Sequence, residues 1–338
     1  MRAFVIIGPH SSEVQDVPEP VAGAGQVVVD VERAGVCGTD VEFFTGEMSY
    51  LHDGQARYPI RIGHEWCGVV RDAGPGVDGR WVGRRVTGDT MLGCGGCGRC
   101  TGGRQHLCAD RHEIGIRNGW PGALAERLLV PARALQALPD EVGPALGALV
   151  EPGGNALRAV RGAALSPGDR LLVIGPGTIG LLVAQIAAAR GAEVHLLGVT
   201  DASVGFARGL GCGAVWTPAT LPALRWDAVV DASNAATSPA AALDLVEPGG
   251  RVVYIGLSGT PSLLDSRTLA LKDVTAVGVL SASGGLAGTV ELYASGAVDP
   301  RPLVAATIGL SEAASALSGS RPAAWGAAPK VHIDPSLD

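Results

Sequence analysis

Four closely spaced cysteines constrain the fold of this chain more than any other feature. They follow the spacing C-x2-C-x2-C-x7-C, at Cys94, Cys97, Cys100 and Cys108. Four thiolates can complete the tetrahedral shell of a Zn²⁺ ion within one loop. Disulfides are the alternative, but they need Cβ atoms about 3.8 Å apart in the right orientation, which cysteines so close in sequence reach with difficulty. The spacing therefore predicts a structural zinc site. Because such a site has no open position for water, the chemistry must lie elsewhere.

Composition excludes several classes of protein. A chain of 338 residues is expected to form about two domains. A net charge of −7 without a Lys/Arg stripe argues against nucleic-acid binding. The apolar run at 171–189 is broken by Gly175-Pro176-Gly177 and is no membrane span. The opening run at 1–7 is too short for a signal peptide, and seven cysteines favour a reducing compartment. We therefore expect a soluble, cytoplasmic protein.

The pattern of apolar and polar residues changes near residue 155 and divides the chain into two parts. Up to about residue 150, short apolar or alternating runs are separated by Gly, Pro and Asp, which predicts a β-rich part. After Ala156, strand and helix patterns alternate, which predicts parallel βαβ units in a doubly wound sheet. The last segments, including a strand at Lys330–Ile333, are expected to rejoin the first part. The predicted division is 1–154 with 290–338 for the β-rich domain, and 155–289 for the α/β domain.

A glycine-rich turn opens the α/β part. Gly175-Pro-Gly177-Thr-Ile-Gly180 matches G-x-G-x-x-G, directly after an apolar strand pattern and directly before a helical one. This context predicts a dinucleotide-binding turn rather than an ordinary glycine-rich connection. Gly175 would make the tight turn, Gly177 would let a pyrophosphate approach the backbone, and Gly180 would allow close helix–sheet packing. The backbone N–H groups at the helix start, at Thr178 and Ile179, would meet the phosphate charge.

The residue expected to contact the adenosine ribose is unusual. NAD-selective proteins usually place Asp or Glu at the end of the second strand, whereas the pattern at Glu193–Gly198 ends on glycine. Asp201 lies three residues too late, and no Arg or Lys occurs in 199–203 to attract a 2′-phosphate; only Thr200 offers a hydroxyl. The choice between NAD and NADP stays open, with a mild preference for NADP or dual use.

A second set of metal-ligating residues lies in the β-rich part. Cys37 occurs in Cys-Gly-Thr-Asp and His64 in Gly-His-Glu. A zinc ion that performs chemistry needs about three protein ligands and an open position, which Cys37, His64 and a carboxylate would provide. A lone Cys or a lone His is more often a core or surface residue than a metal ligand. The assignment of these two residues as ligands therefore depends on the motifs around them.

That context is a resemblance to zinc-dependent medium-chain dehydrogenases, and it covers essentially the whole chain. Five motifs occur in that family's order, namely Gly35-Val-Cys37-Gly-Thr39-Asp40, Gly63-His64-Glu65, the four-cysteine segment, Leu149-Val-Glu151-Pro152 and Gly175-Pro-Gly177-Thr-Ile-Gly180. The motifs are most similar to those of the polyol, threonine and aldose dehydrogenases. The resemblance implies a GroES-like β-rich catalytic domain and a doubly wound Rossmann domain that binds NAD(P).

The resemblance also implies ligands for a catalytic zinc. Alcohol dehydrogenase uses Cys₂His, but this chain has no cysteine near 150–160. Carried over from similar polyol dehydrogenases, the ligands are Cys37, His64 and Glu65, with Glu151 adjacent to the metal or exchanging onto it. Glu65 could instead orient a ligand without binding the metal. Two zinc ions per chain are therefore expected, one catalytic and one structural.

Three further positions follow from the resemblance. Thr39 is similar to the hydroxyl that passes the substrate proton outward, although it could instead cap a helix. Glu42 stands where many relatives carry His, and it is either part of this proton path or a solvated surface residue. Gly153 and Gly154 follow Glu151-Pro152 where relatives usually have apolar side chains, so we expect a wider pocket near the metal.

Together these features predict a zinc-dependent oxidoreductase that moves a hydride between NAD(P) and a secondary hydroxyl or ketone of a polyol, sugar or (amino)cyclitol. The alternatives are an aldose 1-dehydrogenase, favoured by Glu42, a threonine 3-dehydrogenase and a zinc-independent quinone-type reductase. A non-catalytic scaffold would be expected to have lost the catalytic constellation. We expect a small-molecule substrate, no nucleic-acid or membrane partner, and a homodimer or homotetramer that associates through the strand at Val274–Val279.

Overall fold

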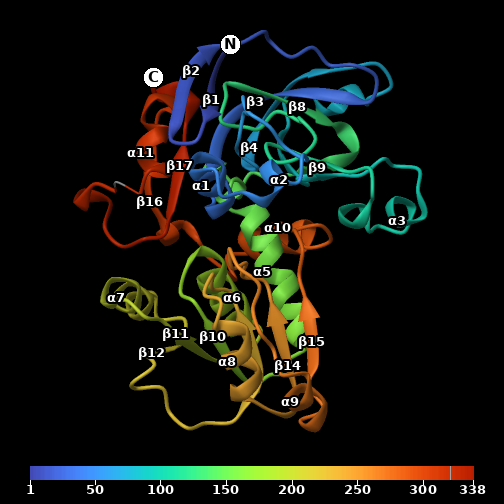
Figure 1. The fold of residues 1–338 in the computed structure, drawn as a ribbon. Helices are drawn as coiled ribbons and strands as arrows, with labels where there is room; N and C mark the ends of the chain where they lie inside the picture. Colours follow the sequence, from blue (N-terminus) through green and yellow to red (C-terminus); the bar gives the residue numbers. More distant parts are fainter. Residues whose placement is uncertain (320) are drawn as a thin grey trace.

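The computed structural model describes residues 1–319 and 321–338. It shows a β-rich part, which contains both ends of the chain, above an α/β part built on a parallel sheet (Figure 1). Helix α5 (Val150–Ala163) runs between the two parts. In the described residues no helix is both long and apolar enough to span a membrane.

The β-rich part is organised by a seven-stranded sheet in the order β16-β17-β3-β4-β5-β9, with β8 also paired to β3. Alternate side chains of these strands fill a core around Trp66 and Ile114, as half-buried strands require. The strands are β3 (Gln26–Gly35), β4 (Glu65–Ala73), β5 (Arg85–Gly88), β8 (Arg127–Pro131), β9 (Leu135–Ala137), β16 (Val304–Ile308) and β17 (Lys330–Ile333). The last two strands confirm that the final segment rejoins the first part of the chain.

The α/β part contains a six-stranded parallel sheet in the order β12-β11-β10-β13-β14-β15. Counted along this part of the chain, the order is 3-2-1-4-5-6, that of a dinucleotide-binding sheet. Both faces are buried, since Leu171 and Val173 pack toward α5 and α6 while Leu172 and Ile174 pack toward α8. The strands are β10 (Arg170–Ile174), β11 (Glu193–Leu197), β12 (Ala214–Trp216), β13 (Trp226–Asp231), β14 (Val246–Tyr254) and β15 (Thr275–Gly278). The predicted doubly wound fold is confirmed.

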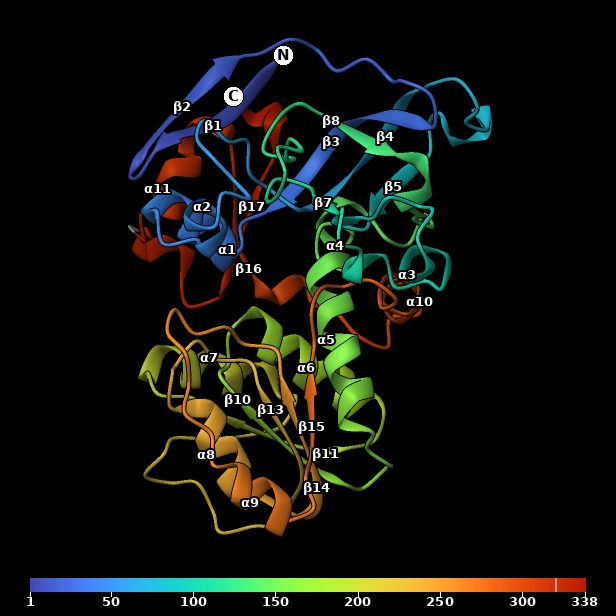
Figure 2. The ribbon, with the colours of Figure 1, turned by 45° about the vertical axis from the view of Figure 1, so that its right-hand side comes forward.

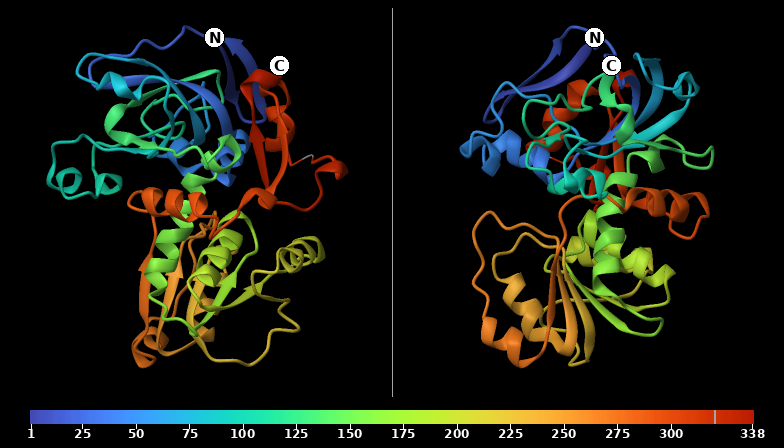
Figure 3. Two further views of the ribbon diagram at one scale, coloured as in Figure 1. Left: turned by 180° about the vertical axis from the view of Figure 1, so that it is seen from behind. Right: turned by 90° about the vertical axis from the view of Figure 1, so that its right-hand side faces the viewer.

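The remaining elements are short or flank the sheets. The other helices are α1 (Gly38–Thr45), α2 (Ser49–His52), α3 (Gly98–Thr101), α4 (Pro144–Gly147), α6 (Thr178–Ala189), α7 (Asp201–Leu210), α8 (Ser238–Leu245), α9 (Ser266–Leu271), α10 (Leu286–Ala294) and α11 (Ala313–Leu317). The other strands are β1 (Arg2–Gly8), β2 (Ser11–Asp16), β6 (Met91–Leu92) and β7 (His112–Glu113). The segment around α3 projects from the side of the β-rich part (Figures 1 and 3).

Helices α5 and α10 pack together where the two parts meet (Figure 2). Both predicted domain limits, at 154/155 and 289/290, fall inside these helices, and the limits stay a prediction. Gly153 faces this contact, since a Cβ there would overlap Tyr293 Oη, whereas a Cβ on Gly154 would lie 2.9 Å from Ala282 Cβ, in the segment before α10. The expected wider pocket is therefore wrong, because Tyr293 and Ala282 fill the space beside these glycines.

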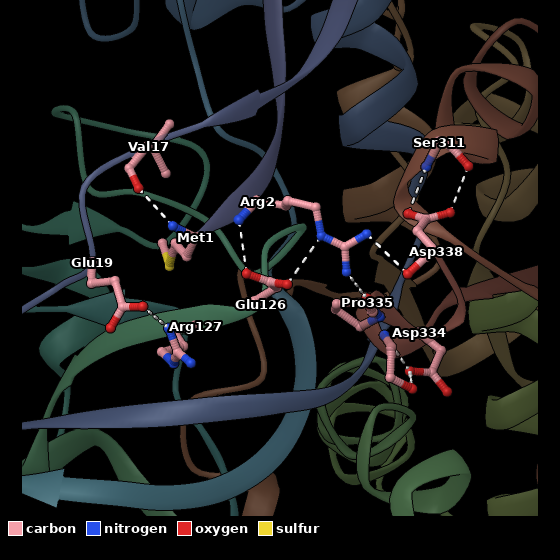
Figure 4. Close-up of polar contacts among 11 residues, drawn as sticks. Met1, Arg2, Val17, Glu19, Glu126, Arg127, Ser311, Asp334, Pro335 and Asp338 are labelled. Carbon is pink, nitrogen blue, oxygen red and sulfur yellow. Dashed lines mark hydrogen bonds and ion pairs between the residues drawn. The ribbon is translucent and has the colours of Figure 1, made fainter.

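Hydrogen bonds hold the first and the last described residues close to one another (Figure 4). The backbone N–H and the guanidinium of Arg2 donate to the Glu126 carboxylate over 2.8 and 3.0 Å. The same guanidinium donates to the carbonyl of Pro335 over 3.0 Å, and Ser311 N–H donates to Asp338 over 3.0 Å. These contacts join β1 to the C-terminal segment, which carries a residue of the site described below.

Candidate active site

The predicted metal ligands converge although they are far apart in sequence. Cys37 is the N-cap of α1, two residues after the end of β3; Glu65 begins β4, and His64 directly precedes it. Antiparallel pairing of β3 with β4 places Gly35 opposite Glu65, which brings the two segments together. The sulfur of Cys37, a ring nitrogen of His64 and a carboxylate oxygen of Glu65 lie within 4.8 Å of one another. Thiolate, imidazole and carboxylate at such separations fit the donor set of a zinc ion.

Asp40 orients two of these groups, a role that the sequence analysis did not assign. Its fully buried carboxylate accepts from Cys37 N–H over 2.8 Å and from Gly63 N–H over 3.2 Å. One of its oxygens lies 3.6 Å from His64 Nδ1. Burial lowers the pKa of His64, but Asp40 and Cys37 together more than offset burial, and the pKa lies well above its ordinary value. With Nδ1 turned toward Asp40, Nε2 is left for a metal. The sequence could have indicated this role, because Asp40 stands three residues after the N-cap Cys37, at the position of a capping box.

Lys330 pairs with Glu65 in the interior and was also missed. Its Nζ donates to both carboxylate oxygens of Glu65, over 2.8 and 2.7 Å, and to the carbonyl of Val36 over 2.9 Å. Both side chains are almost fully buried. Burial disfavours the charged Lys330, but the Glu65 carboxylate more than offsets it and raises the lysine pKa. A Cβ on Gly35 would overlap Glu65 Oε2, so glycine is needed there. Each carboxylate oxygen has two lone pairs, so Glu65 keeps the capacity to bind a metal.

Glu151 lies beside this cluster but is not one of the three converging ligands. It is buried in the first turn of α5 and accepts from Asn155 Nδ2 over 2.9 Å. Burial raises the pKa of Glu151 to about 7; the charge of His64 opposes this shift and that of Glu65 adds to it. A carboxyl of this kind exchanges a proton readily near neutral pH. Its role at the metal stays a prediction.

Thr39 and Glu42 lie on α1, the helix that Cys37 caps. The alternative in which Thr39 caps this helix is wrong, because Cys37 occupies the N-cap position. Glu42 is half-buried and not a freely solvated residue; burial and the nearby charge of Glu47 raise its pKa. The proton-path roles of both residues stay predictions.

The segment that contains Cys94, Cys97, Cys100 and Cys108, called the four-cysteine lobe below, brings its four sulfurs together as the spacing predicted. Their sulfurs lie within 4.8 Å of one another, with 3.5 Å between Cys97 and Cys100, 3.8 Å between Cys97 and Cys108 and 4.0 Å between Cys94 and Cys100. A tetrahedral zinc with Zn–S bonds of about 2.3 Å has sulfurs about 3.8 Å apart, whereas a disulfide needs about 2.05 Å. Several hydrogen bonds, of which the one from Cys100 N–H has the largest effect, lower the pKa of Cys97 to about 6. The thiolate form that a metal needs is therefore favoured at Cys97, whereas burial raises the pKa of Cys100 to about 11.

The glycine-rich turn joins β10 to α6 as expected. Gly175 has φ of +94°, which favours glycine. Gly177 is the N-cap of α6, and a Cβ there would meet nothing within 4 Å, so the backbone is open to a ligand. A Cβ on Gly180 would overlap the carbonyl oxygen of Gly175. The first-turn N–H groups of Thr178 and Ile179 lack helical acceptors and can meet a phosphate.

Gly198 and Thr200 each have a structural role beside this turn. A Cβ on Gly198 would lie 2.8 Å from Pro176 Cγ and 2.9 Å from Val204 Cγ2, so glycine lets the end of β11 pack against the turn. Thr200 caps α7 by accepting from Ser203 N–H over 3.3 Å. The missing carboxylate at position 198 therefore has a steric reason as well as a consequence for the cofactor.

The site and the sheet together define a zinc-binding dehydrogenase, and the comparisons with known proteins agree. The alcohol dehydrogenase GroES-like domain matches residues 23–140, and the zinc-binding dehydrogenase domain matches residues 178–295. The chain belongs to the zinc-dependent medium-chain dehydrogenase family.

The relatives include enzymes of sugar and polyol metabolism. The chain is 32% identical to a 2-dehydro-3-deoxy-L-galactonate 5-dehydrogenase of Pseudoalteromonas atlantica, over 94% of each chain. It is 30% identical to a sorbitol dehydrogenase of Halalkalibacterium halodurans, over 78% of this chain and 79% of the relative. Among solved structures, alcohol dehydrogenase TADH from Thermus sp. ATN1 covers 99% of each chain at 27% identity with a TM-score of 0.88.

Proposed function

We propose that the protein is a zinc-dependent dehydrogenase that transfers a hydride between NAD(P) and a secondary hydroxyl or ketone of a polyol, sugar or (amino)cyclitol. The convergence of Cys37, His64 and Glu65 is the observation that carries this proposal. The sugar-acid and polyol substrates named for the relatives support the substrate class. An L-threonine 3-dehydrogenase of Anaeromyxobacter sp. is also 30% identical over 78% of each chain, so a threonine 3-dehydrogenase remains the second candidate.

Cys37, His64 and Glu65 would hold the catalytic zinc, with Glu151 beside it. Bound there, zinc supplies Lewis acidity, which lowers the pKa of a coordinated alcohol and polarises a carbonyl. The protein's own part is to keep these donors in place. Asp40 lies 3.6 Å from Nδ1 of His64 and favours its charged form, and Lys330 balances the charge of Glu65 where both side chains are almost fully buried.

Thr39 and Glu42 would move the substrate proton outward along α1. Both side chains come from the helix that Cys37 caps, and both are half-buried. The raised pKa of Glu42 suits a group that exchanges protons closer to neutral pH than an exposed carboxyl does. Cys94, Cys97, Cys100 and Cys108 would hold a second, structural zinc ion.

The cofactor would lie at the carboxyl ends of β10 and β13, where the strand order reverses. The turn from Gly175 through Gly177 to Gly180 would receive its pyrophosphate at the N-terminus of α6, and Gly198 would present no carboxylate to repel a 2′-phosphate. A zinc-binding dehydrogenase candidate of Sinorhizobium meliloti 1021, bound to NADP, is 28% identical over 99% of each chain with a TM-score of 0.88. This supports the mild preference for NADP.

We further propose a cytoplasmic homodimer or homotetramer. Strand β15 is the edge of the six-stranded sheet, and its Thr275 and Ala276 are exposed, so its free backbone groups can pair with a second copy. The seven cysteines, all within the described residues, are free, which supports a reducing compartment.

The substrate class is tested by a screen of purified enzyme. Polyols, aldoses, sugar acids and L-threonine are each offered with NAD and with NADP, and reduced nicotinamide is read by its absorbance. We expect turnover with polyols or sugar acids and little with L-threonine. Oxidation of aldoses at C1 alone would establish the aldose 1-dehydrogenase alternative, and turnover of L-threonine alone would overturn the proposed class.

The cofactor preference is tested by replacing Gly198 with aspartate. An aspartate carboxylate at this position repels a 2′-phosphate, so NADPH binding should weaken by on the order of tenfold more than NADH binding. Because any side chain here meets Pro176 and Val204, Gly198→Ala is the matched steric control and should weaken both equally. Equal ratios in the two variants would show that the ribose is recognised elsewhere.

A further inference from the structure

The segment that follows β15 is placed at the nicotinamide half of the cofactor site. A dinucleotide-binding sheet consists of two mononucleotide-binding halves, and ligands lie outside the carboxyl ends of the strands. Strands β10 to β12 form the half with the pyrophosphate turn and the adenosine side, so β13 to β15 form the nicotinamide side. Residues 279–285 leave the carboxyl end of β15 and lead into α10 (Figures 1 and 2).

This segment has a constrained backbone. Ser281 has φ of +68°, a left-handed conformation that residues other than glycine adopt only when their surroundings hold them there. The guanidinium of Arg158, from α5, donates to the carbonyl oxygens of Leu280 and Ser281, over 2.6 Å in the second case. Ser281 Oγ donates to Ser283 Oγ over 3.1 Å. The conformation is therefore held by Arg158 from outside the segment and by Ser283 from within it.

The second anchor comes from the β-rich part. Ser283, almost fully buried, donates from its Oγ to Asp89 Oδ1 over 2.9 Å. Asp89 lies between β5 and β6, and 194 residues separate it from Ser283. Its carboxylate is also buried and accepts from Met91 N–H over 3.0 Å and from Gln105 Nε2 over 2.8 Å. A buried carboxylate needs each of these donors, so the bond from Ser283 is costly to lose.

Gln105 connects this anchor to the four-cysteine lobe. It lies between Cys100 and Cys108, and a Cβ on Gly93, next to Cys94, would be 3.0 Å from Gln105 Cβ. A continuous path of contacts thus runs from the lobe through Gln105 and Asp89 to Ser283. The lobe holds none of the three converging ligands, yet through Asp89 it is connected to the segment after β15.

We propose that Asp89 and Ser283 are positioning residues that hold residues 279–283 in the shape that receives the nicotinamide half of NAD(P), and that Gln105 ties this anchor to the four-cysteine lobe. The proposal rests on the NAD(P)-dependent function proposed above. It assigns the lobe a task in cofactor binding in addition to its structural one.

The test compares a whole cofactor with a fragment that lacks nicotinamide. NADH and ADP-ribose, and in parallel NADPH and 2′-phospho-ADP-ribose, are titrated into the full-length enzyme and Ser283→Ala by calorimetry. Loss of one hydrogen bond to a buried carboxylate should weaken binding of the reduced cofactor by on the order of tenfold, while the fragment binds within about twofold of the unchanged enzyme. The KM for the cofactor should rise by a larger factor than kcat falls.

Two further variants sharpen the result. Asp89→Asn should give a smaller change in the same direction, because its amide oxygen still accepts from Ser283. Ser295→Ala is the matched control, since the hydroxyl of this exposed serine at the end of α10 donates to the carbonyl of Leu292 in its own helix; it should change neither affinity. Equal weakening of cofactor and fragment by Ser283→Ala, or no change in either, would overturn the proposal. Failure of the unchanged enzyme to bind NADH or NADPH would instead overturn the proposed function.

Discussion

Replacing Cys37 by serine should lower kcat by at least about a thousandfold, because a Lewis-acidic metal contributes several kcal/mol to such chemistry. Cys37 is one of three side chains whose ligand atoms converge, and a serine hydroxyl is a poor substitute for a thiolate. The zinc content should fall from about two ions per chain to about one, because the lobe keeps its own ion. Turnover with the best substrate of the screen and elemental analysis of the same preparation measure both effects.

The control is Cys212→Ser. Cys212 is a half-buried cysteine outside both groups of converging ligands, and burial raises its pKa, so it stays a neutral thiol. This variant should keep both turnover and two zinc ions. Circular dichroism and cofactor titration should show that Cys37→Ser remains folded and still binds the nucleotide. Turnover within tenfold of the unchanged enzyme would refute the assignment of Cys37.

Replacing Lys330 by methionine should destabilise the protein by about 3–5 kcal/mol, because it leaves the Glu65 carboxylate buried without its partner. The ion pair is short, at 2.7 Å, and both side chains are only 2–3% exposed. Methionine has a similar length, so packing changes little. Denaturant unfolding followed by circular dichroism measures the free-energy change.

An exposed ion pair provides the comparison. Arg80 and Asp78 lie 2.6 Å apart, but the arginine side chain is 87% exposed, so Arg80→Met should leave the unfolding midpoint nearly unchanged. The double variant Lys330→Met with Glu65→Gln should recover part of the lost stability, since it removes the uncompensated charge. A Lys330→Met protein as stable as Arg80→Met would show that the buried pair contributes little.

The sequence predicted local features well because their physical causes are local. The spacing of the four cysteines, from Cys94 to Cys108, brings their sulfurs together within one short segment. The glycine-rich turn depends on Gly175 in a left-handed conformation and Gly180 against its carbonyl oxygen. The strand and helix patterns after residue 170 depend on side-chain periodicity. The resemblance to known dehydrogenases then placed distant motifs in one fold.

Other features were missed or misjudged because they depend on long-range packing. Gly153 and Gly154 suggested a wider pocket, but Tyr293 of α10 and Ala282 of the preceding segment, both far along the chain, take that space. Asp40 stood within a recognised motif without an assigned role. Nothing local distinguished Asp89 from any other acidic residue in a loop, and only the fold places it against Ser283.

What the sequence alone determined is the chemistry available: a sulfur, an imidazole and carboxylates for one metal, four sulfurs for another, and a turn for a dinucleotide. What only the tertiary structure decided is how that chemistry is held. Lys330 and Glu65 are 265 residues apart, and they meet because β17 and β4 both pair with β3 in one register. A shift of one residue in that register would turn either side chain to the opposite face of the sheet, and local patterns do not specify such a pairing.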